Sequence, residues 1–119
     1  MAELSDDERD TVIATARSQK GTPHSRIDCS HLVHLAYEAV RPDLRYLTTD
    51  GLAASKLYDH NVKIPKPGDL VLWGGHVGIV IDHDKRKFIG SQTSTGVAEA
   101  SYAKGSYWGN RTHSFLRLR

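Results

Sequence analysis

Residues 67–82 read PGDLVLWGGHVGIVID and decide the fold of this 119-residue chain. Two runs rich in branched and aromatic residues, 68–73 and 76–82, stand on either side of Gly74 and Gly75. Residues of these types favour β-strands, and a glycine pair between two such runs is typical of a tight hairpin. The stretch therefore predicts two antiparallel strands joined by a two-residue loop.

Further strands are predicted downstream of this hairpin. The run over 76–82 turns through HDKR into KFIGSQ at 87–92, which predicts a second hairpin. GVAEAS at 96–101 and HSFLRLR at 113–119 have the same character. Consecutive strands joined by short connections predict an antiparallel meander.

The N-terminal part of the chain has helical patterns instead. Ser5 stands three residues before Glu8, which is the spacing of a capping box. Apolar residues follow at helical offsets as far as Ala16, and Gly21 supplies a stop. These signals predict a first helix that packs on the core.

Two more helices are expected before the strands begin. Asp28 is a good N-cap for a second helix, which carries a broad apolar stripe and should end before Pro42. A shorter third helix is predicted within residues 48–59, capped by Thr49 or Asp50.

The order of these elements indicates the fold class. Helices followed by consecutive antiparallel strands describe an α+β fold, with the N-terminal helices packed on one face of an antiparallel β-sheet meander. The composition, 39% hydrophobic and 25% charged, is that of an ordinary globular protein. We therefore expect residues 1–119 to form a single domain.

Charge and hydropathy exclude several classes of partner. The formal net charge is +2, and no block of lysine and arginine with interleaved aromatic residues occurs, so we expect no nucleic-acid partner. No apolar run approaches the roughly 20 residues of a membrane span. The first ten residues, MAELSDDERD, are acidic and show no signal-peptide pattern.

The only cysteine, Cys29, falls at the start of the predicted second helix. One cysteine excludes an internal disulfide and a multi-cysteine zinc site. Unpaired N–H groups at a helix N-terminus favour an anion, so we expect the pKa of the Cys29 thiol to be lowered. The same groups could donate to the oxyanion formed when a thiolate attacks an amide carbonyl. Cys29 is thus either a small buried residue or a nucleophile.

A thiolate hydrolase also needs a base, normally a histidine. His76 opens a strand directly after the glycine pair, where its ring can project from the sheet rim toward a docked helix N-terminus. Four other histidines lie along the second helix or in polar turns: His31, His34, His60 and His83. His113, which begins the last strand, stays a candidate. His76 is the expected partner of Cys29.

The segments DCSHLV, which begins at Asp28, and PGDLVLWGGHVGIVID resemble the NlpC-type cysteine peptidases, papain-like enzymes of bacterial cell-wall metabolism. In that family an Asp-Cys-Ser stretch opens the catalytic helix, and a Pro-Gly-Asp strand leads into a His-Val-Gly-Ile strand. The resemblance spans roughly residues 21–97, and both motifs occur in the required order. It implies a papain-like fold and a cysteine peptidase or amidase.

The resemblance also implies roles for individual residues. Cys29 would be the nucleophile, and His76 the general base and acid. The family's third catalytic residue is a polar side chain (His, Asn or Gln) that orients the imidazole. Its usual position falls near Gly90, which cannot do this, so we predict Gln92 in that role and Ser91 as the alternative.

Four residues are predicted to contact the substrate. Asp28 and Ser30 match family residues that help to bind the stem peptide. His24 stands where the family commonly has a tyrosine, and His31 stands where it usually has glycine. We expect His24 and Ser91 to be substrate-binding as well, and we expect the groove beside Cys29 to differ from that of typical members.

The substrate implied by the resemblance is an amide in the peptidoglycan stem peptide, most often between D-glutamate and diaminopimelate. The segments GTP at 21–23, GS at 90–91 and WGNRT at 108–112 are also similar to cell-wall amidase effectors delivered by type VI secretion. This second likeness implies export by a specialised secretion system, action on the wall in the periplasm or in a target cell, and an immunity protein as an inhibiting partner.

Three rival interpretations compete with a cysteine peptidase. The first is a metal site built from His24, Cys29, His31 and His34. It is disfavoured, because Cys29 and His31 diverge on a helix. Only His31 and His34 share a face, and two ligands are too few for structural zinc. We therefore expect no metal and no cofactor. A related thiol hydrolase acting on another amide or ester stays open, as does a papain-like module that binds cell-wall peptide without cutting it.

Overall fold

The computed structural model describes residues 3–119, and its first helix begins as the capping box predicts. Helix α1 spans Asp6–Arg17. Ser5 Oγ accepts a hydrogen bond from the N–H of Glu8 at 3.2 Å, and Glu8 Oε1 accepts one from the N–H of Ser5 at 2.9 Å. The apolar side of the helix, which includes Val12 and Ala16, is fully buried.

Helix α2 spans Cys29–Glu38 and confirms the second expected helix. Asp28 is its N-cap, and the carboxylate accepts a hydrogen bond from the N–H of His31 at 2.9 Å. The cap therefore fixes Cys29 as the first residue of the helix.

Helix α3 spans Thr49–Ala54 and is shorter than the predicted segment. Thr48 is its N-cap, with its hydroxyl accepting a hydrogen bond from the N–H of Gly51 at 3.1 Å. The expectation that Thr49 or Asp50 caps this helix is wrong, because Thr48 still has extended backbone angles and both later residues are already helical.

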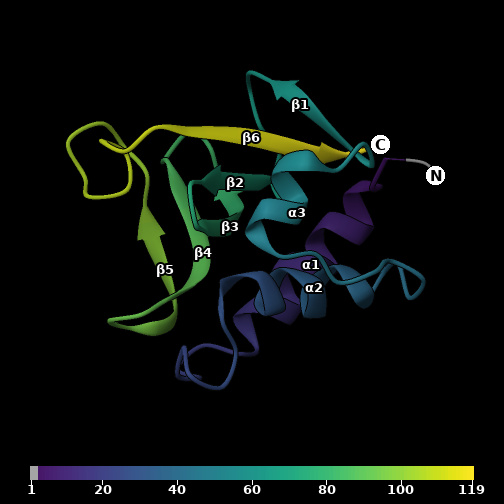
Figure 1. Cartoon of the computed structure of the whole chain (residues 1–119), viewed down its shortest axis with the longest axis horizontal. Helices are drawn as coiled ribbons and strands as arrows, with labels where there is room; N and C mark the ends of the chain where they lie inside the picture. The colour runs from purple at the N-terminus through teal and green to yellow at the C-terminus, as the bar shows by residue number, and fades with distance from the viewer. Residues whose placement is uncertain (1–2) are drawn as a thin grey trace.

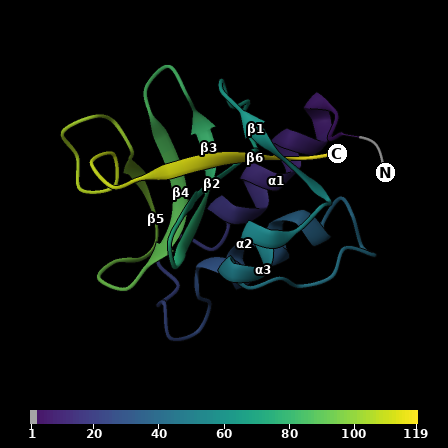
Figure 2. The same ribbon diagram turned by 45° about the horizontal axis from the view of Figure 1, so that its top comes forward.

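Six strands form one antiparallel sheet with the order β1-β6-β2-β3-β4-β5 (Figure 1). They are β1 Tyr58–Val62, β2 Leu70–Trp73, β3 His76–Asp82, β4 Lys87–Gln92, β5 Gly96–Ser101 and β6 His113–Leu118. Strands β2 to β5 are the predicted meander, and Trp73 pairs with His76 across the two-residue loop. The last strand, β6, returns to pair with β2 and β1, so the sheet as a whole is more than a meander (Figure 2).

Strand β1 was not predicted, and its first two residues, Tyr58 and Asp59, fell inside the segment expected to be the third helix. It lies at the edge of the sheet and pairs only with β6, for instance through Tyr58 and Leu118. Its sequence, YDHNV, has no apolar alternation. Pairing with a strand more than 50 residues later in the sequence therefore sets its conformation.

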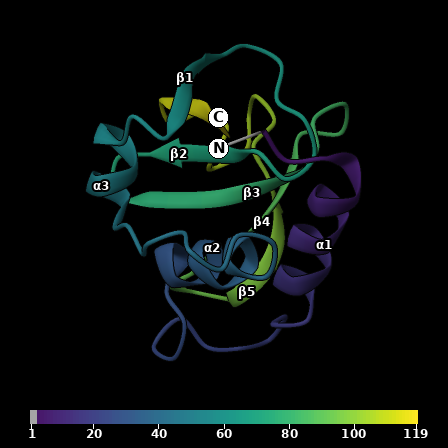
Figure 3. The same cartoon turned by 90° about the vertical axis from the view of Figure 1, so that its right-hand side faces the viewer.

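The sheet separates two apolar clusters. Helices α1 and α2 pack side by side on one face, with α2 against β3 and β4 (Figure 3). The main core lies between them and the sheet. A smaller cluster covers the other face and consists of Val71, Trp73, Val80, Phe88 and Tyr102, with Trp108 and Phe115 packed against it. Among residues 3–119, no helix is long and apolar enough to cross a membrane.

Side-chain alternation along β3 decides where His76 points. Val77 and Ile79 belong to the main core, whereas Val80 belongs to the smaller cluster. His76 has the same parity as Val80, and its ring lies among the aromatic residues of the smaller cluster. Cys29 belongs to the main core. The two residues therefore approach from different sides of the sheet, at the end where β3 begins.

Candidate active site

The Cys29 thiol lies at the N-terminus of α2 and faces the start of β3. The backbone N–H groups of Val77, Ser30 and Cys29 itself act on the thiol as donors that lower its pKa and so favour the thiolate. Val77 directly follows His76 in the sequence. The nucleophile proposed from the sequence is thus held against the first peptide units of the strand that carries the proposed base.

The predicted lowering of the Cys29 pKa is wrong. Burial raises the pKa of the Cys29 thiol, and the nearby Asp28 carboxylate raises it further, which together outweigh the N–H donors. Only 7% of the residue is exposed. The sequence indicated the helix terminus but not the packing over it, and desolvation opposes a charge.

His76 is also buried, and its pKa is shifted in the direction that keeps the ring neutral. Burial lowers the pKa of His76 to about 4. Gln92 raises it as a side-chain hydrogen-bond partner, while His24 and Arg111 lower it electrostatically. With both shifts taken together, the resting site holds a neutral thiol and a neutral imidazole at pH 7.

Gln92 occupies the space that a side chain at position 90 would need. A Cβ atom placed on Gly90 would lie 2.6 Å from Gln92 Oε1. The Gln92 amide nitrogen donates to the Ala98 carbonyl at 3.4 Å, which leaves Oε1 as the free acceptor. The structure therefore brings Gln92 and His76 together, on neighbouring strands β4 and β3.

The contact between Gln92 and His76 is not an ideal hydrogen bond. Gln92 acts on the pKa of His76 as a hydrogen-bond partner. By strict geometry, however, His76 Nε2 and Gln92 Oε1 are both buried without a partner among the described residues. Because buried polar atoms are rarely left unpaired, the two atoms face one another with poor alignment. A small rotation of the amide would complete the bond.

Asp28 and Ser30 form a polar cluster beside the nucleophile. Asp28 Oδ1 accepts hydrogen bonds from Ser30 Oγ at 3.1 Å and from the His31 N–H, and it contacts the His31 ring nitrogen at 2.7 Å. Although burial acts to raise the pKa of Asp28, these bonds lower it on balance. The Ser30 and Tyr46 hydroxyls share a hydrogen bond at 2.7 Å.

Tyr46 is a site residue that the sequence did not reveal. Its ring stacks on His31, with centroids 4.2 Å apart, and it contacts His34 edge-on. It belongs to the connection between α2 and α3, where no pattern marked it. The signal that could have found it is an aromatic residue in a loop that the α2 to α3 turn brings back over the helix start.

The two other predicted substrate-binding residues lie in different environments. His24 lines an open cavity of about 430 Å³ together with Ser25 and the turn over 93–96. Ser91 is fully buried, and its hydroxyl donates to the Ile27 carbonyl at 2.5 Å. Ser91 therefore holds the segment before α2 and presents no surface to solvent.

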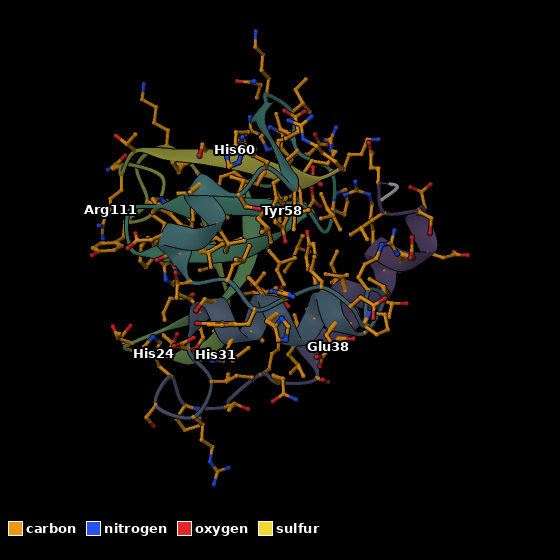
Figure 4. All side chains as sticks on the ribbon, turned by 45° about the vertical axis from the view of Figure 1, so that its right-hand side comes forward. His24, His31, Glu38, Tyr58, His60 and Arg111 are labelled. Atoms are coloured by element: carbon orange, nitrogen blue, oxygen red, sulfur yellow. The ribbon has the colours of Figure 1, made fainter. Side chains whose placement is uncertain are left out.

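The remaining histidines have partners away from the thiol. His34 pairs with Glu38 at 3.3 Å, and Glu38 is the last residue of α2, at the opposite end of the helix from His31 (Figure 4). His60 contacts the Ser55 carbonyl, and His83 contacts the Tyr102 hydroxyl at 2.7 Å. Within residues 3–119, no group of three or more His, Cys, Asp or Glu side chains is arranged to hold a metal ion.

Comparison with known proteins supports one family. A model of the NlpC/P60 family matches residues 17–117. The NlpC/p60 domain of the peptidoglycan hydrolase SagA has a similar structure, with a TM-score of 0.66 and 24% sequence identity over 93% of this chain and 98% of that one. A search of curated proteins gave no match.

Two mycobacterial structures have the same fold. The peptidoglycan hydrolase RipB from Mycobacterium tuberculosis has a TM-score of 0.68 at 22% identity, over 95% of this chain and 64% of that one. The P60 domain of an antigen from M. avium subspecies paratuberculosis has a TM-score of 0.68 at 19% identity, over 94% of each chain. These likenesses confirm the α+β papain-like fold.

Proposed function

The chain belongs to the NlpC/P60 family, and from that premise we propose that it cleaves an amide bond in the stem peptide of peptidoglycan, with Cys29 as nucleophile and His76 as base. Members of this family are cysteine peptidases and amidases. SagA and RipB are peptidoglycan hydrolases. We propose further that residues 1–119 form one such domain and that the bond cleaved is the one between D-glutamate and diaminopimelate.

One observation carries the proposal. The buried Cys29 thiol lies at the N-terminus of α2, and the Val77 N–H, one residue after His76, acts on it as a donor that lowers its pKa. The far nitrogen of His76, Nε2, is buried beside the orphaned Oε1 of Gln92. Thiol catalysis needs a nucleophile, a base beside it and an acceptor that orients the base, and Cys29, His76 and Gln92 supply these three parts in that order.

The first half of the reaction forms the acyl-enzyme. The neutral His76 imidazole takes the proton of the Cys29 thiol while the sulfur attacks the amide carbon, and the carbonyl oxygen becomes an oxyanion. N–H groups at the start of α2 are placed to donate to that oxygen. The His76 imidazolium then protonates the leaving nitrogen, the C–N bond breaks and a thioester remains.

Water completes the cycle. His76 removes a proton from a water molecule that attacks the thioester carbon, the C–S bond breaks, and the proton returns to Cys29. Once the Gln92 amide rotates into line, its Oε1 accepts from Nε2–H, which fixes the ring tautomer so that Nδ1 is the base. The resting neutral pair suits this route, because a neutral imidazole is the form that accepts a proton.

The residues around the pair would bind the substrate. The partly exposed Asp28 carboxylate and the Ser30 and Tyr46 hydroxyls offer hydrogen-bond partners on one side of Cys29. His24 and the cavity beside it offer space for a polar group near His76. Export by a specialised secretion system and inhibition by an immunity protein stay predictions.

The proposal is tested by digesting purified diaminopimelate-type peptidoglycan and identifying the fragments by mass spectrometry. The native protein should release fragments cut within the stem peptide, and Cys29→Ala and His76→Ala should release none. His83→Ala is the matched control, because His83 lies beyond the other end of β3 and should not affect cleavage. Intact wall with active-site and control proteins alike would contradict the proposal.

Intact wall would also separate the two rival functions. A Cys29 thiol that reacts with an activated ester substrate, with release of the alcohol, would move the search to another amide or ester. A protein that sediments with the wall and has no turnover on any of these substrates would favour a module that binds without cutting.

A further inference from the structure

The connection between β5 and β6 covers the His76 ring with an indole. Trp108 and His76 are stacked, with ring centroids 4.2 Å apart and an angle of 16° between the planes. The other aromatic neighbours lie differently: Trp73 is tilted at 5.5 Å, and Phe88 is edge-on at 6.4 Å. Trp108 is thus the neighbour that presents the face of its ring to the face of the imidazole.

The backbone of this connection is held independently of the Trp108 side chain. Trp73 Nε1 donates to the carbonyl oxygen of Trp108 at 2.9 Å, and Trp73 is 3% exposed. The next residue, Gly109, packs so closely that an added Cβ would lie 1.8 Å from the Ala103 carbonyl oxygen. Trp108 is therefore placed by main-chain contacts, and its side chain can be changed without removing them.

Charged and polar groups approach His76 from several elements. Arg111, from the same connection, places its guanidinium carbon 5.3 Å from the centre of the Trp108 ring, and its charge disfavours a protonated His76. His24, from the segment before α2, acts in the same direction, and Gln92 on β4 acts in the opposite one. Cys29 on α2 faces the following residue. An imidazolium at this place is therefore disfavoured by Arg111 and His24 and favoured by one neutral acceptor, Gln92.

An aromatic face attracts a cation that lies over it. The Trp108 indole can thus offset part of the repulsion that an imidazolium meets in this site. A stacked ring also restricts rotation of the imidazole, which keeps Nε2 directed at Gln92.

We propose that Trp108 is a positioning residue for His76, which holds the plane of the imidazole and attracts the imidazolium formed when the ring takes the Cys29 proton. This inference rests on the proposed function in one respect, that His76 is the base. Trp108 stacks on the His76 ring, so it acts through that ring.

The test compares Trp108→Phe with Trp108→Leu. Both variants keep the main-chain acceptor for Trp73 and both shorten the side chain, but only phenylalanine retains an aromatic face. We expect kcat on a stem-peptide substrate to be about fivefold or more lower for Trp108→Leu than for Trp108→Phe, with KM equal within about twofold. Lys104→Ala, at an exposed position on the same connection, should match the native protein.

A second readout does not depend on turnover. NMR of protein with ring-labelled histidine gives the pKa of His76 directly, and we expect it to be lower in Trp108→Leu than in Trp108→Phe. In the native protein the His76 ring protons should also be shifted upfield by the indole. Circular dichroism checks that each variant is folded, and the native upfield shift tests the stack even if one variant is not.

The outcomes distinguish the two proposals. Equal kcat and equal His76 pKa in the Phe and Leu variants would overturn the role of Trp108, as would an unshifted His76 resonance in the native protein. Loss of all cleavage in the native protein, with the NMR differences intact, would overturn the proposed function and leave the Trp108–His76 coupling standing.

Discussion

At the scale of single residues, Cys29 is subject to two opposing effects. Helix N–H groups favour the thiolate, while burial and the Asp28 carboxylate disfavour it, and the second pair prevails. His76 is neutral for the related reason that burial disfavours its charge. The site therefore stores no ion pair at rest and must create charge during the reaction, when a substrate carbonyl is present to accept it.

The raised Cys29 pKa predicts slow alkylation at neutral pH. The rate of reaction with iodoacetamide should climb about tenfold per pH unit from pH 7 to beyond pH 9, because only the thiolate reacts. Asp28→Asn keeps a good N-cap and removes the charge that disfavours the thiolate, so it should react faster at pH 7. Mass spectrometry follows the single cysteine. A rate already constant at pH 7 would mean that the thiolate is stable there.

The pKa of His76 predicts activity in acid. His76 must be neutral to act as base, and with a pKa of about 4 it is neutral at every pH above that value. The value of kcat/KM on a soluble stem peptide should thus fall only as pH drops through about 4, well below the ordinary histidine range. Gln92→Glu places a negative charge beside the ring and should move this limb to higher pH. An acid limb near pH 6.5 in the native protein would contradict the assignment.

Gly90 gives a test of the third residue that leaves Gln92 itself intact. A methyl group at position 90 would collide with Gln92 Oε1 and approach the Phe88 ring at 3.1 Å, so Gly90→Ala should displace the amide. We expect Gly90→Ala and Gln92→Ala to lower kcat by a similar factor, about tenfold, and the double variant to lose little more, because both remove one contact. Additive losses would show that the two changes act separately.

At the scale of the elements, the start of α2 is held from two sides. Asp28 caps it from within, and Ser91 on β4 donates to the carbonyl of Ile27 just before it. The Val77 N–H on β3 meets the Cys29 sulfur. The position of the nucleophile thus depends on α2, β3 and β4. Ser91, the predicted alternative to Gln92 as the third catalytic residue, is buried because it holds the segment before α2.

Removing the Ser91 hydroxyl should loosen this attachment. Ser91→Ala deletes a buried hydrogen bond between β4 and the segment before α2, and we expect the free energy of unfolding to fall by about 1 kcal/mol. Urea denaturation measures the change. Ser94→Ala, at an exposed position in the next turn, is the control and should be neutral within about 0.5 kcal/mol. Equal stability of the two variants would show that the hydrogen bond from Ser91 to the Ile27 carbonyl does not stabilise the fold.

The elements differ in how far the sequence predicts them. Strands β2 to β6 and the capped helices α1 and α2 follow from local patterns, since caps, glycine turns and runs of branched residues act over a few residues. Strand β1 does not, because only its distant partner β6 makes it a strand. The same limit applies to the site. Cys29, His76 and Gln92 stand in or beside recognisable motifs, whereas Tyr46 and Trp108 reach the site from connections, and burial sets pKa directions that no local pattern contains.

At the scale of the whole molecule, the site lies where two apolar clusters meet around the end of the sheet. Cys29 belongs to the main core under the helices, and His76 belongs to the aromatic cluster on the other face. The relative position of the two residues therefore depends on the packing of α1 and α2 against the sheet. Contacts that join the first helix to the last strand contribute to the geometry of the site from a distance.

Asp69 makes the principal contact of this kind. Its carboxylate accepts from Arg9 on α1 at 2.8 Å and from two nitrogens of Arg117 on β6 at 2.8 and 3.0 Å. Asp69 is 1% exposed, and Arg9 is buried as well. The sequence predicts Asp69 to lie at the start of a strand. Through Arg9 and Arg117, its carboxylate joins both ends of the chain to the hairpin that carries His76.

Asp69→Ala should therefore be the most damaging change outside the site. It leaves the buried Arg9 charge without its buried carboxylate partner, with only the half-exposed Glu3 to pair with it, and breaking a buried pair in this way costs about 3–5 kcal/mol. Urea denaturation should show this loss. Glu3→Gln is the matched control, since Glu3 contacts the same Arg9 at 3.4 Å from a half-exposed position and should cost less than about 1 kcal/mol. A loss for Asp69→Ala no greater than that of the control would mean that helix and sheet are held by apolar packing alone, and the position of Cys29 relative to His76 would then depend on the main core.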